Sequence, residues 1–399
     1  MLNTILFDNA ETRTNLLPIS YTRPIANIRV GILTIGEKWQ QMLQAEQVSY
    51  AASPYIQACF PLVIEDDNLF VAGHICPNPA LVEETASLQP GEALFKGEEL
   101  IAFRGSHDDF TNGNFAGKKE FSGTYNAIYF PHDIFLVAGD EIRTDFYRIT
   151  AGRQSQPLSP TNKLIGNPVD EHGFPQIFIE EGASVEGAVL NVAHGPIYVG
   201  KNAEIMEGAC IRGSFALCDN SHVNMGCKIY SNTVIGPWSK VGGELNNVVI
   251  IGYSNKAHDG FLGNAVIGEW CNLGAGCVAS NLKNDYTEIR LWNYAKKSFI
   301  RTGLQFCGLI MGDHSKAGIN TMFNTATVVG VGCNIHGTGF PRPFIPSFRE
   351  GAPNSGFFPV QMQKFYQIAE RVMARRNRTL TEHDRAIFDA IKAYSSQFE

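Results

Sequence analysis

The segment from Lys256 to Asn281 carries the residues of this chain that are best suited to chemistry. It reads KAHDGFLGNAVIGEWCNLGAGCVASN. The repeat described below gives Ala257 an inward position, so His258 is expected to point outward, where the repeat breaks. An imidazole titrates at about pH 6.5, so an outward histidine at a break could act as a general base. The alternative is a solvent-exposed histidine beside a turn, and the local residues alone favour that alternative.

The elements that must hold this segment are indicated by a repeat of six residues. Neither a helix nor a strand alone gives a run of sixes, whereas residues two apart in a strand share one face. Two positions before each later repeat residue, the side chain is small in every case except Phe215. The pattern predicts a hexapeptide-repeat parallel β-helix of stacked coils. The aliphatic repeat residues are Val199, Ile205, Ile211, Leu217, Val223, Ile229, Ile235 and Val241.

The same register continues on both sides of this run, with interruptions. Insertions in a solenoid leave as loops on one face, often the binding face. The interruptions fall at 186–198, 242–250, 258–266 and 280–310, so ligand contacts are expected there. The further residues in register are Ile179, Val185, Ile251, Ala257, Ile267, Leu273, Ala279, Met311, Ala317, Phe323, Val329 and Ile335.

The cysteines and histidines do not form a metal-binding pattern. A zinc enzyme built on hexapeptide repeats needs outward histidines at matching coil heights. The histidines near the coils lie on different breaks, so no metal is expected: His194, His222, His258, His314 and His336. Four of the nine cysteines occupy the small inward position and are predicted to fill the core in a reduced, cytoplasmic protein: Cys227, Cys271, Cys277 and Cys333.

The chain divides into four parts by composition. Residues 1–155 lack the sixfold period and read as an α/β domain, and 156–175 are rich in Pro, Ser, Asn and Gly, as in a linker. Residues 176–340 carry the β-helix. Residues 341–399 begin as a Pro-rich strap and end in two helical patterns, the second with Thr381 as N-cap. The strap and helices are expected to cap the end of the solenoid.

The α/β domain opens with LFDNAETRTNLLPISYTRP, which resembles the first motif of sugar-phosphate nucleotidyltransferases. The resemblance implies that Arg13 and Arg23 contact a nucleotide. The family's glycines are replaced at 9–11, and His74 stands where a magnesium-binding Asp is expected. Mg²⁺ is therefore expected only if this domain is active, and a remnant domain kept for fold or assembly remains the alternative. The matching residues are Thr12, Arg13, Leu17 and Pro18.

The segment after Lys256 resembles the acetyltransferase half of the bifunctional UDP-N-acetylglucosamine pyrophosphorylase/glucosamine-1-phosphate N-acetyltransferase family. That family has Lys-Ala-Gly-His, then Leu-Gly-Asp, then Asn-Ile-Gly-Ala-Gly, then Cys-Asn. A variant bacterial branch is closer, and it shares GFLG, GEWCNLGA, SNLKN, GLQFCGLIMGDHSK and GINTMFNT. This likeness runs through almost the whole chain. The residues kept from the family are Lys256, Ala257, His258, Leu262, Gly263, Asn272, Gly274, Ala275, Gly276 and Asn281.

The resemblance implies a left-handed β-helix, a homotrimer with active sites between neighbouring subunits, and acetyl transfer from acetyl-CoA to an amino-sugar 1-phosphate. His258 would be the general base, and Asn272 and Asn281 would hydrogen-bond the sugar or the acyl group. Nucleotidyl transfer that forms a UDP-sugar could accompany the reaction. The family's tyrosine falls at Phe261, and one residue is missing between Ala257 and the histidine.

Further contacts follow from the same resemblance. Ala275 and Gly276 would lie beside the pantetheine arm of acetyl-CoA. Apart from the resemblance, the aromatic and basic residues of the 280–310 insertion, Trp292 among them, could cover the adenine and phosphates of CoA by stacking and charge. The alternative is an arm that packs on a neighbouring subunit. The cations available for the substrate phosphate, each alternatively a solvated surface charge, are Lys228, Lys240 and Lys256.

Composition excludes several other classes. The net charge is −7 and the basic residues cluster only in a short patch near Arg375, so nucleic acid is not an expected partner. No apolar stretch reaches the length of a membrane span, and no secretion signal precedes the domain. Two alternative functions stay open. One is a sugar-1-phosphate nucleotidyltransferase with a purely structural or regulatory β-helix, and the other is a catalytically silent sugar-nucleotide-binding protein.

Overall fold

The structure, a computed structural model, describes every residue except 1 and 399, and these residues form two compact units. Unit 1 comprises residues 2–16, 22–28 and 33–130, and the remaining described residues form unit 2. Helix α5 (Pro131–Thr150) belongs to unit 2 because it packs on strands β19 (Glu244–Gly252) and β21 (Gly260–Glu269). Gly139 allows this approach, since a Cβ there would lie 2.3 Å from Oδ1 of Asn232.

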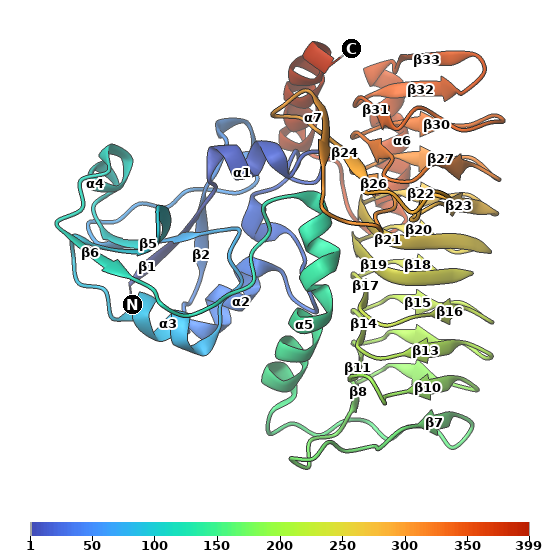
Figure 1. Cartoon of the computed structure of the whole chain (residues 1–399), viewed down its shortest axis with the longest axis horizontal. Coiled ribbons are helices and arrows are strands. Elements are labelled where there is room, and N and C mark those ends of the chain that lie inside the picture. The colour runs from blue at the N-terminus through green and yellow to red at the C-terminus, as the bar shows by residue number, and fades with distance from the viewer. Residues whose placement is uncertain (1, 399) are drawn as a thin grey trace. The chain divides into compact units, whose positions relative to one another are not determined.

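Unit 1 is an α/β domain around one mixed sheet with the strand order β2-β1-β3-β5-β4-β6 (Figure 1). Strand β1 runs parallel to β2 and β3, and β5 runs antiparallel to β3 and β4. The strands are β1 (Asn3–Phe7), β2 (Val48–Ala51), β3 (Asn68–Ala72), β4 (Glu92–Lys96), β5 (Glu99–Gly105) and β6 (Gly117–Glu120). The helices are α1 (Ala10–Asn15), α2 (Ile35–Met42), α3 (Pro79–Ala86) and α4 (His107–Asn112), with short 3₁₀ turns η1 (Ile25–Asn27) and η2 (Pro54–Ile56).

Unit 2 contains a left-handed parallel β-helix, as the hexapeptide pattern and the resemblance predict. Most coils contribute one short strand to each of three faces, and the long strands β19 and β21 run through the first and second faces (Figure 1). The first face holds β7 (Lys163–Ile165), β10 (Val189–Asn191), β13 (Cys210–Arg212), β16 (Lys228–Ile229), β23 (Cys277–Ala279) and β28 (Met322–Phe323). The second holds β8 (Ile177–Ile179), β11 (Ile197–Val199), β14 (Phe215–Leu217), β17 (Thr233–Ile235), β26 (Ile310–Met311), β29 (Val328–Val329) and β31 (Phe344–Ile345).

The third face carries most of the residues discussed below. Its strands are β9 (Ser184–Val185), β12 (Glu204–Ile205), β15 (His222–Val223), β18 (Lys240–Val241), β20 (Asn255–Lys256), β22 (Asn272–Leu273), β27 (Lys316–Ala317), β30 (Asn334–Ile335), β32 (Arg349–Ala352) and β33 (Gly356–Pro359). Strand β7 lies within the segment expected to be a linker, where it pairs with β10. Strands β31 and β32 show that the Pro-rich strap continues the coils, because they pair with β29 and β30.

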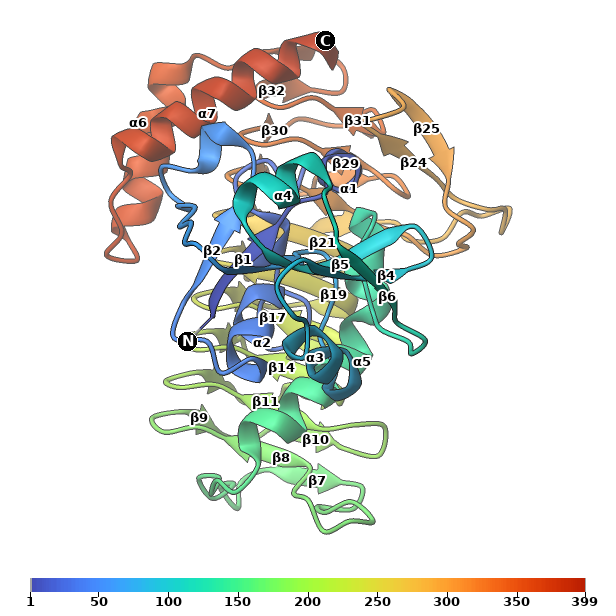
Figure 2. The same cartoon turned by 90° about the vertical axis from the view of Figure 1, so that its left-hand side faces the viewer.

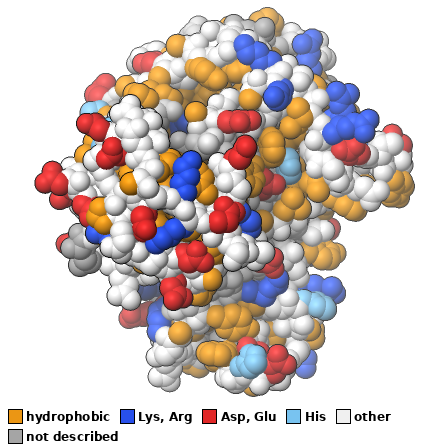
Figure 3. All heavy atoms as spheres, turned by 60° about the vertical axis from the view of Figure 1, so that its left-hand side comes forward, with side chains coloured by type: hydrophobic (Ala, Val, Ile, Leu, Met, Phe, Trp, Pro, Cys, Tyr) orange, Lys and Arg blue, Asp and Glu red, His pale blue; other side chains and the backbone are white. Residues whose placement is uncertain are grey.

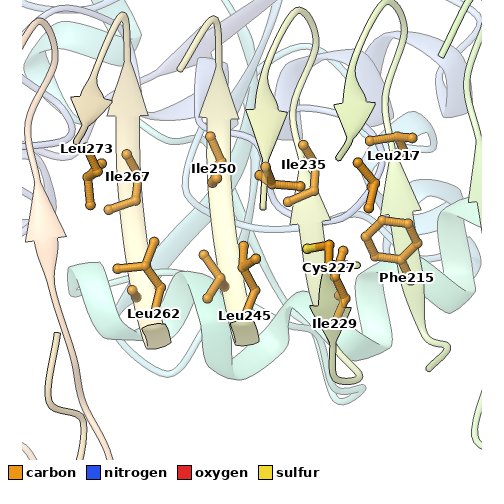
Figure 4. Packing of buried hydrophobic residues seen from close by; sticks show 14 of the residues in the cluster. Phe215, Leu217, Cys227, Ile229, Ile235, Leu245, Ile250, Leu262, Ile267 and Leu273 are labelled. Carbon is orange, nitrogen blue, oxygen red and sulfur yellow. The ribbon is translucent and has the colours of Figure 1, made fainter. Parts of the chain in front are cut away.

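The predicted inward residues form the core of the β-helix. All eight aliphatic repeat residues and their seven partners two positions earlier are buried. Ile211 pairs with Ile229 and Val223 with Val241, so equivalent residues stack three hexads apart. Figure 4 shows part of this core, with Leu217, Ile229 and Ile235 packed near Phe215 and Cys227. The predictions for Cys227, Cys271, Cys277 and Cys333 are confirmed, because all four are buried free thiols.

The predicted register is wrong over one coil. Ile250 pairs with Ile235, and Lys256 pairs with Val241, so these residues face inward in place of Ile251 and Ala257. The reason is that β19 pairs with strands of both the first and the second face and runs through the corner between them. The coil from Val241 to Lys256 is therefore shorter than three hexads, and the sixfold count overshoots.

An aromatic corner runs along the side of the β-helix that precedes the third face. Five coils place a ring residue there in a left-handed backbone conformation, with φ between 54° and 61°. This conformation costs an L-residue roughly 1–2 kcal/mol, so the rings must gain from packing. Tyr253 stacks on Trp270 with ring centroids 4.3 Å apart, and Trp270 lies 6.0 Å from His314. The corner residues are Trp238, Tyr253, Trp270, His314 and Phe348.

The C-terminal helices cover the upper part of this aromatic corner (Figure 2). Helix α6 (Met362–Ala374) places Phe365 5.7 Å from the ring of His314, and α7 (Glu382–Ser395) places Phe388 at 5.2 Å. Thr381 caps α7 through a capping box, as the sequence predicts, and η3 (Ser396–Phe398) follows. The helical tail is thus held by the rings of the corner.

The surface of the described residues is mixed in charge. Figure 3 shows acidic and basic side chains interspersed on the face in view. None of the helices between residues 2 and 398 combines the length and apolar character that a membrane span requires.

Candidate functional site

A pocket of about 460 Å³ lies on the third face, next to the aromatic corner and α6. Lys240 and Asn272, two of the residues predicted to bind substrate, both line it. We call it the third-face pocket. Its other lining residues are Tyr253, Asn255, Ala257, Trp270, Cys271, Lys316, Val372, Arg375 and Arg376.

The floor of the third-face pocket is a row of polar side chains on adjacent strands. Lys240 pairs with Asn255, Asn255 with Asn272, and Asn272 with Lys316. Neighbouring strands lie about 4.8 Å apart, so these four outward side chains form one ladder along the β-helix. The alternation that buries Val241 and its equivalents puts all four polar groups on the pocket side.

Lys316 and Arg376 are held by the corner that borders this pocket. Nζ of Lys316 donates to the carbonyl oxygens of Trp270 (2.5 Å) and His314 (3.0 Å), and burial lowers the pKa of Lys316 to about 8. Nε of Arg376 donates to the carbonyl oxygen of Trp238 at 3.3 Å. Burial, followed by the like charge of Arg375, lowers the pKa of Arg376. The pocket therefore gathers several basic side chains, although Lys316 also feels the opposite charge of Asp313.

His258 lies at the corner where β20 ends. It is exposed, and it directly follows Ala257, which lines the third-face pocket. The next residue, Asp259, accepts a hydrogen bond at its carbonyl oxygen from the N–H of Gly276 (2.9 Å). The Ala275–Gly276 turn is thus one coil above His258. The structure brings the predicted base and the predicted pantetheine-binding turn to one corner.

Gly276 is required by this stacking of turns. Its φ is +72°, and a Cβ would lie 2.1 Å from Oδ1 of Asn320 in the turn above. Only glycine accepts this conformation and this contact without strain. The glycine predicted to border the pantetheine arm therefore already has a structural role.

Lys256 is not available to a substrate phosphate on the third face. Its side chain is fully buried within the coil, and Nζ donates to the carbonyl oxygens of Gly242 (3.1 Å) and His258. Burial lowers its pKa, against the attraction of Cys227 and Cys277. The sequence predicts that Ala257 faces inward, but in the structure Lys256 faces inward instead.

Three other predicted residues lie away from the third-face pocket. Lys228 is on the first face, where it lines a separate pocket. Nδ2 of Asn281 donates to Oδ1 of Asn264 at 2.9 Å, on the strand that follows His258. Trp292 lies on the hairpin of β24 (Arg290–Asn293) and β25 (Ser298–Arg301), with its ring stacked 4.1 Å from that of Phe344. Its indole packs on its own chain.

In unit 1, Arg13 takes part in a buried ion pair. Its Nη1 lies 2.6 Å from Oδ2 of Asp8 and 3.0 Å from the carbonyl oxygen of Arg23. Burial raises the pKa of Asp8 although the guanidinium lies beside it. Asn9, which replaces a family glycine, caps helix α1 by accepting from the N–H groups of Glu11 and Thr12. A helix start thus occupies the region expected to hold a phosphate-binding loop.

His74 stands where a magnesium-binding carboxylate was expected. Its Nε2 lies 2.8 Å from Oε1 of Glu99, whose Oε2 accepts from the hydroxyls of Tyr125 (2.6 Å) and Tyr129 (2.8 Å). Burial opposes ionisation of Glu99, but these hydrogen bonds outweigh it and lower its pKa to about 2. Both oxygens of Glu99 are engaged, and both oxygens of Asp8 are as well.

These groups do not fit a magnesium site. Mg²⁺ at nucleotide sites is usually held by one or two carboxylates together with phosphate oxygens and waters. The two carboxylates in question are already engaged, Glu99 by His74 and two tyrosines and Asp8 by Arg13 and the N–H of Ile25. Among residues 2–398, no three His, Cys, Asp or Glu side chains meet in a way that could hold a metal ion. We therefore derive no step through Mg²⁺.

Sequence reasoning missed the contributions of Lys316, Arg375 and Arg376. The only signal was the short basic patch near Arg375. The sequence near Arg375 does not indicate that α6 ends beside the third face. This position depends on contacts with rings of the aromatic corner, which are distant in sequence.

Comparisons with known proteins find one family match and several relatives of low identity. Residues 4–154 match the family described as Sugar nucleotidyl transferase. The chain is 25% identical over 209 residues to the Bifunctional protein GlmU of Rippkaea orientalis, covering 45% of this chain and 42% of that protein. It is 27% identical over 160 residues to the Bifunctional sugar-1-phosphate nucleotidylyltransferase/acetyltransferase of Sulfurisphaera tokodaii, covering 40% and 37%. The chain thus spans less than half the length of these relatives.

Solved structures with some likeness are also known. The UDP-N-acetylglucosamine acyltransferase of Arabidopsis is 14% identical with a TM-score of 0.21, covering 55% of this chain and 80% of that one. A hexapeptide transferase family protein of Anaplasma phagocytophilum is 14% identical with a TM-score of 0.16, covering 56% and 90%. The resemblance predicted from the sequence is confirmed by the sequence matches: the chain is similar, at low identity, to the bifunctional sugar-1-phosphate nucleotidyltransferase/acetyltransferases, and its N-terminal part matches the sugar nucleotidyl transferase family.

Proposed function

We propose that this protein transfers an acetyl group from acetyl-CoA to an amino-sugar 1-phosphate of the glucosamine 1-phosphate type. One observation carries the proposal: the exposed His258 lies between a polar, cationic pocket lined by Ala257 and the glycine turn of Ala275 and Gly276. The similarity to bifunctional nucleotidyltransferase/acetyltransferases supports the same reaction.

The proposed step needs one base and no metal ligand from the protein. The amine of the sugar attacks the thioester carbonyl, so a C–N bond forms and the C–S bond breaks. His258 accepts the proton that the amine loses, and this proton can then pass to the departing CoA thiolate. Positioned general bases contribute typically 10²–10⁴-fold to such reactions. Asn272, on the floor of the pocket, would hydrogen-bond the sugar or the acyl group, whereas Asn281 lies away from this pocket and is given no role in the step.

The assembly is proposed to be a homotrimer in the cytoplasm, with sites between neighbouring subunits. Two large apolar side chains support a partner at this corner: Met225 and Ile319, each 71% exposed. They lie in the turns that follow β15 and β27, as His258 follows β20. The free cysteines are consistent with a reducing compartment.

The test measures the release of CoA from acetyl-CoA in the presence of glucosamine 1-phosphate, with the free thiol quantified by titration. His258→Ala should lower kcat by at least about 100-fold, as expected for loss of a general base. His336→Ala is the matched control, because His336 is an exposed histidine in the turn after another third-face strand, β30. Equal turnover in all three proteins would refute His258 as the base. No turnover in the wild type, where a known acetyltransferase works, would refute the reaction.

A second candidate is nucleotidyl transfer by unit 1, with the β-helix structural or regulatory. The family match of residues 4–154 favours it, whereas the Asp8–Arg13 ion pair and the engaged Glu99 oppose it. Pyrophosphate release from UTP and N-acetylglucosamine 1-phosphate would identify this activity. Thermal stabilisation by a UDP-sugar without turnover of any substrate would instead identify a silent binding protein.

A further inference from the structure

Four cationic side chains from separate parts of unit 2 line the third-face pocket. Lys240 comes from β18, Lys316 from β27, and Arg375 and Arg376 from the end of α6. The lining residues, all in the described part of the chain, include no Asp or Glu. Like charges that lie close together repel one another, and of these four described side chains only Lys316 faces a carboxylate, that of Asp313 behind the lining, so a bound anion would stabilise the arrangement.

The charges of this cluster are poorly matched by the protein itself. Arg375 is exposed and, among residues 2–398, forms no ion pair or side-chain hydrogen bond. Arg376 makes only long contacts, 3.3 Å to the carbonyl oxygen of Trp238 and 3.5 Å to Oδ1 of Asn255. In contrast, Lys364 and Arg385 on the same pair of helices face Glu350 and Glu370.

The shape of the pocket suits a phosphorylated sugar. Guanidinium groups bind phosphate oxygens in pairs, and lysines add point charges. The Asn255 and Asn272 amides on the floor offer donors and acceptors for hydroxyl groups. Trp270 and Tyr253 supply an apolar wall. At about 460 Å³, the volume falls within the range of about 300–1,000 Å³ typical of small-molecule sites.

We propose that Arg375 and Arg376, with Lys240 and Lys316, bind the phosphate ester of the acetyl acceptor. The sugar would then extend along β20 toward Ala257, with its amine toward His258. This inference rests on the proposed acetyl transfer. According to this inference, two of the phosphate-binding cations come from the end of the C-terminal helix α6. Neither the sequence motifs nor the family resemblance predicts cations at that place.

The same cations could in principle hold the phosphate groups of acetyl-CoA. Both ligands are phosphate esters, so the experiment must compare them separately. Binding is followed by calorimetry and by tryptophan fluorescence, since Trp270 lines the pocket. The ligands are glucosamine 1-phosphate, unphosphorylated glucosamine and acetyl-CoA, each titrated alone so that no turnover occurs.

The variants are Arg375→Gln and Arg376→Gln, with Arg371→Gln as the matched control. Arg371 is an exposed arginine one turn earlier on α6, outside the pocket lining. Each pocket variant should weaken glucosamine 1-phosphate binding about tenfold, as for loss of one charge-assisted contact, and the control should not. Binding of glucosamine and acetyl-CoA should stay within about twofold, and Arg376→Lys should recover part of the loss. Circular dichroism of each variant checks the fold.

Two results would overturn the inference. One is unchanged glucosamine 1-phosphate affinity in both pocket variants, and the other is weakened acetyl-CoA affinity with unchanged sugar phosphate affinity. Failure of the reaction is distinguishable from failure of the pocket. Weaker binding in the variants without any acetyl transfer would refute the reaction but keep the pocket. Acetyl transfer with an unchanged KM for the sugar phosphate would refute the pocket but keep the reaction.

Discussion

Lys256 donates a hydrogen bond from inside the β-helix to the carbonyl oxygen of His258. The buried lysine thereby fixes the backbone of the corner that carries the proposed base. A second bond from Nζ to the carbonyl oxygen of Gly242 joins this corner to the coil below. The lysine of the family's Lys-Ala-(Gly)-His sequence therefore has a structural role in this chain, whereas His258 is the proposed base.

Replacing Lys256 by Met tests this brace. Methionine fills a similar volume, but the carbonyl oxygens of Gly242 and His258 lose their donor. We expect a loss of about 1–3 kcal/mol in the free energy of unfolding and a fall in kcat larger than the change in KM. Urea unfolding and CoA release measure the two effects. Lys228→Met, at an exposed lysine on the first face, is the control. If the variant is as stable as the wild type, the free-energy cost of burying the ammonium group equals the stabilisation from its hydrogen bonds.

The case of Lys256 also shows how far sequence alone could go. The sixfold period identified the β-helix and its inward residues from Val199 to Val241, because each hexad places one aliphatic residue at the same point of the coil. The sixfold count failed at β19, which continues through a corner of the coil. Because the strand is not interrupted by a turn there, this coil has fewer residues than three hexads. The sixfold period alone cannot reveal that this coil is shorter, so the sequence predicted that Lys256 lies on the surface.

The site was predictable only in part, for a different reason. Lys240 and Asn272 directly precede inward repeat residues, so their outward positions followed from the coil pattern. His258 was expected to be outward because Ala257 was expected inward, and the structure places Lys256 inward instead. Arg375 and Arg376 reach the same pocket because rings of the aromatic corner hold α6, and such ring contacts leave no periodic signal. In unit 1, the replaced glycines left a remnant domain as the alternative to an active one, but the Asp8–Arg13 ion pair could be found only from the structure.

Arg13→Ala should destabilise unit 1 strongly. Asp8 and Arg13 are both buried, and removing one partner of a buried pair leaves an uncompensated charge at a cost of about 3–5 kcal/mol. Arg104→Ala is the comparison, because its partner Asp67 is partly exposed and such pairs contribute about 0–1 kcal/mol. Unfolding followed by tryptophan fluorescence reports on unit 1 through the buried Trp39. Equal effects of the two substitutions would contradict a strongly stabilising role of the Asp8–Arg13 pair.

The protein should lose stability as the pH rises above about 9. Burial raises the pKa of Cys227 and Cys271 to about 12, whereas an unfolded thiol ionises near pH 8.5. Between these values the folded state holds more protons than the unfolded state, so the free energy of unfolding falls with increasing pH. Thermal unfolding from pH 7 to 10.5 should show this decline.

A variant pair isolates the thiols in that experiment. Cys271→Ala should flatten the alkaline decline, although it lowers stability at neutral pH by leaving a small cavity. Cys210→Ala, at an exposed cysteine, should leave the decline unchanged. If Cys271→Ala and Cys210→Ala give parallel pH profiles, other groups cause the alkaline loss.

Binding of the sugar phosphate should weaken as the pH rises through about 8, because burial lowers the pKa of Lys316 to about that value. Below this pH the ammonium adds one positive charge to the third-face pocket, and above it the charge is lost. The phosphate, whose second pKa is about 6, remains a dianion throughout this range. Calorimetry with glucosamine 1-phosphate at pH 7, 8 and 9 would measure the change. Lys316→Met should bind more weakly at pH 7 and vary little between pH 7 and 9. A wild-type affinity that stays constant to pH 9 would show that Lys316 does not contribute its charge to the bound phosphate.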